Sequence, residues 1–288
     1  MSRSSAMLLI FLLLLGGCAG LPNGRVGESG PGSRADSAAL LAAADATRAD
    51  GRFGEALQIY QQQLVADQNS AAGQYGMAES LLGLARAGEA KPLFLALAKQ
   101  GAFHARALQG MGIADLALRK YEEAAKSLRE AVNVDATLWR AYNALGLMAD
   151  MKRQRDEAAS LYDTALEINP DSAVVLNNRG YSRLGAGKTD LALADFRQAL
   201  ALDPSSETIQ NNLRIAIAAQ GNYQEATRSL AQGQQAVVLN NVGFIAMQRG
   251  DLTAAEAFLA RAMAAGSRYE AVTAKNLQQV TSLKADSK

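Results

Sequence analysis

A regular spacing of alanines constrains this chain more than any other feature. Six alanines recur at intervals of 34 residues: Ala56, Ala90, Ala124, Ala158, Ala192 and Ala226. Five of them are followed four residues later by a large side chain, namely Tyr60, Phe94, Leu128, Tyr162 and Phe196. Small residues allow paired helices to approach closely, and large residues fill the space between neighbouring units. The period therefore predicts a stack of similar helical units.

The clearest unit begins at Trp139. Its repeating positions hold, in order, Tyr142, Leu145, Gly146, Ala158, Tyr162, Ala165 and Pro170. The units that start at Ala105 and Ala173 carry closely related residues. This pattern resembles the tetratricopeptide repeat (TPR), a pair of helices. The resemblance implies an all-α TPR helical-hairpin solenoid, whose curved inner wall holds another protein.

The period predicts about seven repeats over residues 37–269, with starts near residues 37, 71, 105, 139, 173, 207 and 236. The last interval is only 29 residues, so the second helix of the sixth repeat should be short, with the shortening near Gln232–Gln235. Gly51, Gly221 and Gly250 lie where left-handed helix caps are needed. Residues 270–288 should supply a capping helix and tail, with the helix running from about Tyr269 to Leu283.

Residues 1–17 resemble a bacterial lipoprotein signal peptide. Arg3 precedes an apolar run from Met7 to Leu15, which is too short to span a membrane as a mature helix. The small residues before Cys18 resemble a lipobox, which implies cleavage before Cys18 and lipidation of its thiol. The alternative is an ordinary secretory signal with an unrelated cysteine.

Residues 18–36 should form the lipidated cysteine and a flexible tether, because they are rich in Gly, Ser and Pro. Ala19 stands where an inner-membrane retention signal has aspartate. We therefore expect a lipid anchor on the periplasmic face of the outer membrane. Cys18 is the only cysteine, so no intrachain disulfide can form.

The composition favours a binding protein over an enzyme. The 29 Lys and Arg residues nearly balance the 28 Asp and Glu residues, so no electrostatic footprint for nucleic acid is expected. His104 is the only histidine and lacks companions for a metal site. The sequence shows no phosphate-binding loop and no nucleophile elbow, and we predict neither a cofactor nor catalytic residues.

The candidate binding surface lies on the first helix of each repeat. By analogy with the TPR family, positions 5 and 6 of each repeat face the inner wall. These positions collect asparagine: Asn143, Asn177, Asn178, Asn211, Asn212, Asn240 and Asn241. An amide group can pair with a peptide backbone of any sequence, so a ladder of asparagines can hold an extended polypeptide. Alternatively, the asparagines bond to the backbone of neighbouring helices and set the geometry of the hairpins. We expect asparagines at position 5 to contact the partner more often, and those at position 6 to have this structural role more often.

Apolar side chains accompany these asparagines. Tyr181 and Phe244 occupy position 9, and Met247 lies one turn beyond Phe244. They could form pockets for a ligand helix, or be buried by the adjacent hairpin. Arg179 stands at position 7 of its repeat, which usually holds an apolar residue, and Arg214 stands at position 8 of the next repeat, which usually holds a small residue. Arg179 must find a carboxylate or extend to solvent, and the pair predicts either a specialised surface or a stack that opens there.

The lipobox, the tether and three Asn-Asn stretches, at Asn177, Asn211 and Asn240, together resemble the TadD lipoproteins of tight adherence (Tad, Flp pilus) systems. The resemblance implies a pilotin-like adaptor that binds subunits of the outer-membrane secretin and aids their assembly. A periplasmic scaffold for another envelope machine, such as polysaccharide export or outer-membrane protein insertion, remains an alternative. A hydrolase or transferase with a TPR appendage would need a catalytic domain for which no room remains.

Overall fold

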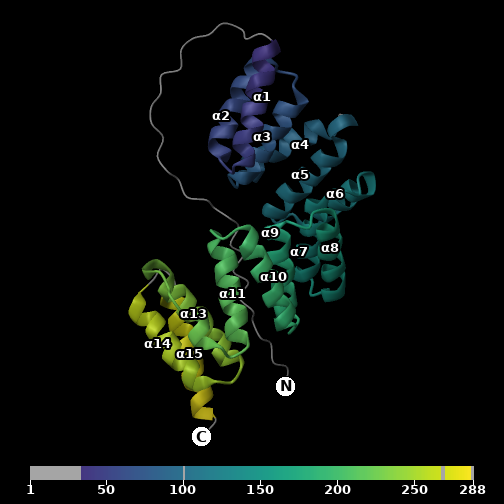
Figure 1. Ribbon diagram of the computed structural model, residues 1–288. Coiled ribbons are helices and arrows are strands. Elements are labelled where there is room, and N and C mark those ends of the chain that lie inside the picture. Colours follow the sequence, from purple (N-terminus) through teal and green to yellow (C-terminus); the bar gives the residue numbers. More distant parts are fainter. Residues whose placement is uncertain (1–33, 100, 267–269, 287–288) are drawn as a thin grey trace. The chain divides into compact units, whose positions relative to one another are not determined.

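The computed structural model describes residues 34–99, 101–266 and 270–286 (Figure 1). These residues are predominantly helical, and no strand occurs among them. The predicted signal peptide, Cys18 and most of the predicted tether lie outside the described residues, as does Tyr269.

Consecutive helices form hairpins, as predicted for an all-α TPR-type solenoid. The α-helices are α1 (Arg34–Ala49), α2 (Phe53–Ala66), α3 (Ala71–Gly83), α4 (Ala87–Leu97), α5 (His104–Ala117), α6 (Tyr121–Val134), α7 (Trp139–Met151), α8 (Arg155–Ile168), α9 (Ala173–Gly185), α10 (Thr189–Leu202), α11 (Glu207–Ala219), α12 (Tyr223–Ala226), α13 (Gln235–Gln248), α14 (Leu252–Ala265) and α15 (Glu270–Asp286). Two short 3₁₀ helices, η1 (Gly101–Phe103) and η2 (Gln232–Gln234), precede α5 and α13.

The chain divides into two compact units, Met1–Leu145 and Gly146–Lys288, and the boundary falls within α7. In the first unit, the first helices of successive hairpins contact one another in the order α1, α3, α5. In the second unit the corresponding order is α9, α11, α13, with α15 packed on α13 and α14. Within each unit, the first helices therefore lie side by side and form one wall of that unit.

The periodic residues form the cores of both units. All six periodic alanines and the five large side chains that follow them have no exposed surface. In four repeats a glycine at position 8 of the first helix allows this packing. A Cβ atom on Gly146 would lie 2.7 Å from Cε1 of Tyr162, and one on Gly180 would lie 2.8 Å from Cε1 of Phe196. The large side chain of the second helix thus rests directly on the backbone of the first.

The turns within the hairpins repeat one backbone conformation. Gly51, Gly221 and Gly250 have positive φ angles of 76°, 93° and 83°, which confirms the predicted left-handed caps. Ala85, Arg119 and Arg153 adopt the same conformation at the equivalent positions, with φ near 60°. Left-handed backbone costs a residue with a side chain about 1–2 kcal/mol. Packing of the hairpin must therefore offset that cost in three of the turns.

The sixth hairpin is irregular, and its second helix is short as predicted: α12 has 4 residues, whereas α10 and α14 have 14 each. Arg214 occupies position 8, where the neighbouring repeats have glycine. Its Nη1 donates to the carbonyl oxygens of Ala226 and Arg228, both at 2.9 Å. The guanidinium thus binds one carbonyl at the end of α12 and one just beyond it.

Substitution of Gly180 tests the close approach in the hairpins. In Gly180→Ala the added methyl group would lie too close to Phe196, which is fully buried and has little room to move. We expect the free energy of unfolding to fall by about 1–3 kcal/mol, as overpacking usually costs. Urea unfolding followed by circular dichroism measures this change.

Gly88→Ala is the control, because Gly88 lies in α4 and a Cβ atom there would have no neighbour within 4 Å. Alanine is the better helix former, so this variant should gain up to about 1 kcal/mol. An unchanged unfolding midpoint for Gly180→Ala would contradict the proposed role of the glycine.

Candidate binding surface

Hydrogen bonds between asparagines join the first helices of the second unit. Nδ2 of Asn212 in α11 donates to Oδ1 of Asn177 in α9 at 2.9 Å. Nδ2 of Asn241 in α13 donates to Oδ1 of Asn211 in α11 at 3.2 Å. Each bond runs from position 6 of one repeat to position 5 of the repeat before it. We call this series the asparagine ladder.

The last helix extends the asparagine ladder. Nδ2 of Asn276 in α15 donates to Oδ1 of Asn240 at 3.1 Å, and Nδ2 of Asn240 donates to Oδ1 of Asn241 at 3.4 Å. The sequence analysis missed Asn276, although its distance of 36 residues from Asn240 is close to one repeat. The helix α15 thus bonds to α13 as the first helix of a further repeat would.

These bonds give both asparagine positions a structural role. An amide carries an acceptor oxygen and two N–H donors. Asn177 and Asn211 use their oxygens in the ladder, and their N–H groups donate to none of the described residues. Both side chains are half-buried, so these donors remain available on the wall. Asn143 and Asn178 are also half-buried, and each of them interacts with another group.

The apolar candidates differ in exposure. Tyr181 is 39% exposed, and Val174 lies two turns earlier on the same face of α9 and is 48% exposed. Burial raises the pKa of the Tyr181 hydroxyl, which keeps it protonated and able to donate a hydrogen bond at neutral pH. Exposed apolar surface beside hydrogen-bonding groups is suited to binding a peptide.

Phe244 and Met247 are less accessible than Tyr181. Phe244 is half-buried and packs against the core formed by Met247, Leu259 and Val280. Met247 is only 7% exposed. The expectation that Met247 lines a groove is therefore wrong, because Val280 of α15 packs in the same core. Met247 is buried, as the alternative expected, but the element that packs on it is the single helix α15 and not a complete hairpin among the described residues.

Arg179 forms ion pairs with two carboxylates, those of Asp163 and Asp195, as expected for an arginine at this position. Its Nη2 and Nε donate to the two carboxylate oxygens of Asp195 at 2.7 and 3.2 Å, and its Nη1 donates to Oδ1 of Asp163 at 2.7 Å. Arg183 also donates to Asp195, whose side chain is 3% exposed. Desolvation opposes the charged guanidinium, but the hydrogen bonds to the two aspartates outweigh it and raise the pKa of Arg179. This network ties α9 to α8 and α10.

The first unit has a different wall. Glu79 of α3 stands at position 9, and its side chain is 5% exposed and paired with Arg140 of α7. Gln109 of α5 accepts a hydrogen bond from the backbone N–H of Ala141 at 3.1 Å. The first unit thus has a helix cap from Gln109 at position 5, where the second unit has amide pairs, and an ion pair from Glu79 at position 9. The sequence analysis missed these residues; only the unusual carboxylate at position 9 could have drawn attention to Glu79.

The described residues offer no site for metal chemistry. They contain no cluster of His, Cys, Asp and Glu that could hold a metal ion. Nδ1 of His104 donates to the carbonyl oxygen of Ala98 at 2.6 Å, beyond the end of α4. Within the same residues, none of the helices combines the length and apolar character needed to cross a membrane.

A double-mutant cycle tests the asparagine ladder. Asn211→Ala and Asn241→Ala should each remove the same hydrogen bond, so their effects on the free energy of unfolding should fail to add by about 1 kcal/mol. Urea unfolding of both single variants and the double variant gives this coupling. The control pair is Asn211→Ala with Asn222→Ala, because Asn222 is exposed and lies outside the ladder. The effects of these two substitutions on the free energy of unfolding should add. Additivity in both pairs would contradict the ladder.

Comparisons with known proteins agree with this architecture. Tetratricopeptide repeat models match residues 39–72, 110–173 and 177–237, together more than half of the chain. A comparison with curated proteins gave no match.

Similar solved structures include a thermophilic TPR protein from Thermus thermophilus, with 21% identity, a TM-score of 0.56, and 63% of this chain and 98% of that chain covered. A TPR protein from Parabacteroides merdae has 14% identity and a TM-score of 0.51, and the match covers 86% of this chain and 99% of that chain. A chain of the APC/C hetero-tetramer Cut9-Hcn1 has 19% identity and a TM-score of 0.63, and the match covers 85% of this chain and 49% of that chain. The chain belongs to the tetratricopeptide repeat family.

Proposed function

We propose that the chain is an adaptor that binds a segment of a partner protein on the wall formed by α9, α11 and α13. TPR arrays are protein-interaction scaffolds, and stacked repeats present extended binding surfaces. The observation that carries the proposal is the exposure of Tyr181 and Val174 on the helix that bears Asn177. The aromatic and aliphatic side chains would hold an apolar residue of the partner. The N–H donors of Asn177 and Asn211 would bind carbonyl oxygens of its backbone.

The proposed location is the periplasmic face of the outer membrane, with Cys18 as the lipid anchor. The apolar run from Met7 to Leu15 and the small residues before Cys18 support this location. Several acyl chains anchor a protein far more stably than one. A tether between the lipid and the first helix would raise the local concentration of a captured partner at the membrane.

The proposed partner is a secretin subunit of a tight adherence (Tad, Flp) pilus system. The support is the resemblance to TadD lipoproteins, in the lipobox and in the Asn-Asn stretches that begin at Asn177, Asn211 and Asn240. The adaptor would then aid localisation and assembly of the secretin, in the manner of a pilotin. A scaffold for another envelope machine, such as polysaccharide export or outer-membrane protein insertion, has the same sequence support from the lipobox and the repeats.

Purification from native membranes tests the location and the partner. The lipidated protein, solubilised in detergent, should co-purify with a secretin that mass spectrometry identifies. The Cys18→Ser variant should lack the lipid and leave the membrane fraction, because serine has no thiol to acylate. Recovery of an export or insertion machine without a secretin would reject the pilus role and keep the scaffold. Membrane retention of Cys18→Ser would reject the lipid anchor.

A matched pair of truncations tests the binding wall with whichever partner is recovered. Tyr181→Ala should weaken binding about tenfold or more, as loss of an aromatic anchor commonly does. Leu202→Ala is the control, because Leu202 is similarly exposed, at 42%, but lies on the second helix α10. Calorimetric titration measures both affinities. Equal affinities for the two variants would place the binding site elsewhere.

A further inference from the structure

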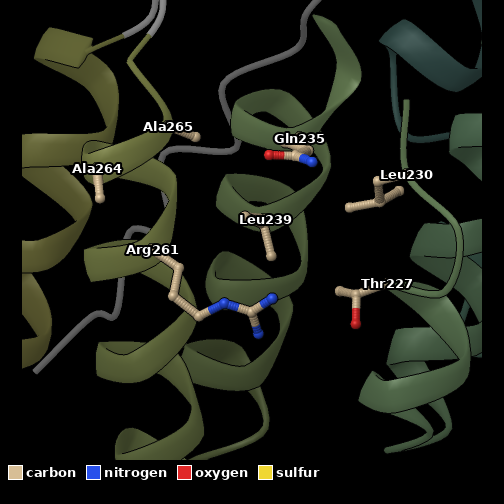
Figure 2. Close-up of a pocket in the computed structure, with 7 residues that line it drawn as sticks. All are labelled: Thr227, Leu230, Gln235, Leu239, Arg261, Ala264 and Ala265. Carbon is tan, nitrogen blue, oxygen red and sulfur yellow. The ribbon is translucent and has the colours of Figure 1, made fainter. Parts of the chain in front are cut away.

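An open cavity of about 420 Å³ lies in the second unit beside the shortened hairpin. Figure 2 shows its lining: Thr227, Leu230, Gln235, Leu239, Arg261, Ala264 and Ala265. These residues come from the segment after α12, from α13 and from α14. The volume falls within the range of about 300–1,000 Å³ that is usual for ligand pockets. None of the proposed functions above uses this cavity.

The cavity follows from the interruption of α12. The second helices on either side, α10 and α14, have 14 residues, whereas α12 has 4. At a rise of about 1.5 Å per residue, roughly 15 Å of helix is missing. Two carbonyl groups at the break, those of Ala226 and Arg228, bond to Arg214 and so have a partner without that helix. The flank of α13 that a complete helix would cover borders the cavity at Leu239, whose side chain is itself only 4% exposed.

The lining combines an apolar surface with a single positive charge. Leu230, Leu239 and the two alanines supply the apolar part. The side chain of Arg261 extends from α14 past Leu239 toward Thr227 (Figure 2). Its guanidinium carbon lies 5.5 Å from the ring centroid of Phe258, and no carboxylate among the described residues forms an ion pair with it.

The start of α13 adds to the positive potential. Gln235 is the first residue of α13, and no side chain caps this helix terminus. The free N–H groups of a helix start carry partial positive charge. Glu207 is the acidic group bonded nearby, and it accepts a hydrogen bond from Nε2 of Gln234 at 3.3 Å. The polar groups that line the cavity itself are Thr227, Gln235 and Arg261, none of which is acidic.

We propose that this cavity is a second binding site, and that it takes a short helical segment of a partner protein with a large apolar side chain next to a carboxylate. The helical form follows from the length of helix that is missing at this place. The apolar side chain would contact Leu230 and the exposed Ala264 and Ala265, and the carboxylate would pair with Arg261. The site lies on the side of second helices, so a partner bound there needs no residue of the asparagine ladder.

Two fluorescein-labelled peptides serve as probes. Both are alanine-lysine helices of 14 residues, the length of α14, with Leu at two positions one turn apart. One carries Glu beside the first Leu, and the other carries Gln there. Fluorescence anisotropy with the purified full chain should show at least about fivefold tighter binding of the Glu peptide. Arg261→Gln should abolish that preference, and Ala264→Trp should block both peptides by filling the cavity.

The variants are chosen to leave the fold intact, because Arg261 and Ala264 are both exposed. Arg197→Gln is the matched control, since Arg197 is an exposed arginine on the second helix α10 and does not line the cavity. It should retain the preference for Glu. Equal binding of the two peptides, or binding that survives Ala264→Trp, would overturn the proposal. Tyr181→Ala should leave peptide binding unchanged, so failure here and failure of the proposed wall are distinguishable.

Discussion

The contact between a glycine on one helix and a large ring or leucine on the next underlies the rest of this structure. Gly146 and Gly180 let Tyr162 and Phe196 rest directly on helix backbone, and Gly112 and Gly243 do the same for Leu128 and Leu259. Each contact fixes how closely the two helices of a hairpin approach. The first helices of successive hairpins can then lie near enough for asparagine side chains to bond across the gap. The ladder is thus a consequence of the hairpin packing.

The irregular sixth hairpin lacks this glycine contact. Arg214 stands where four of the other repeats have glycine, and the second helix of its repeat has only 4 residues. The guanidinium offsets part of the loss by binding two of the carbonyl groups that the missing helix would have used. The short α12, the interval of only 29 residues to the next repeat and the arginine at position 8 thus occur together in the sixth repeat.

The sequence predicted the helical hairpins well, because each hairpin depends on residues within one period. It predicted the short α12 and the left-handed glycines for the same reason. It could not assign the partners of Asn177 and Asn211, which lie 35 and 30 residues further along the chain. The same holds for Asn240 and Asn276, which are 36 residues apart. The burial of Met247 depends on Val280 in α15, and the pair of Glu79 and Arg140 joins residues 61 positions apart. Such contacts follow from the stacking of hairpins, which local spacing does not determine.

The last helix has a consequence for how such an array can change in length. Asn276 and Val280 of α15 bond and pack as the residues of a first helix would, but no second helix follows in the described residues. The face of α15 turned away from α13 and α14 is exposed and mostly polar. A gene duplication that inserted a complete hairpin before α15 would find a matching surface on α14 and leave α15 at the end. The array could therefore be lengthened by whole hairpins between α14 and α15 with the contacts of α15 preserved in kind.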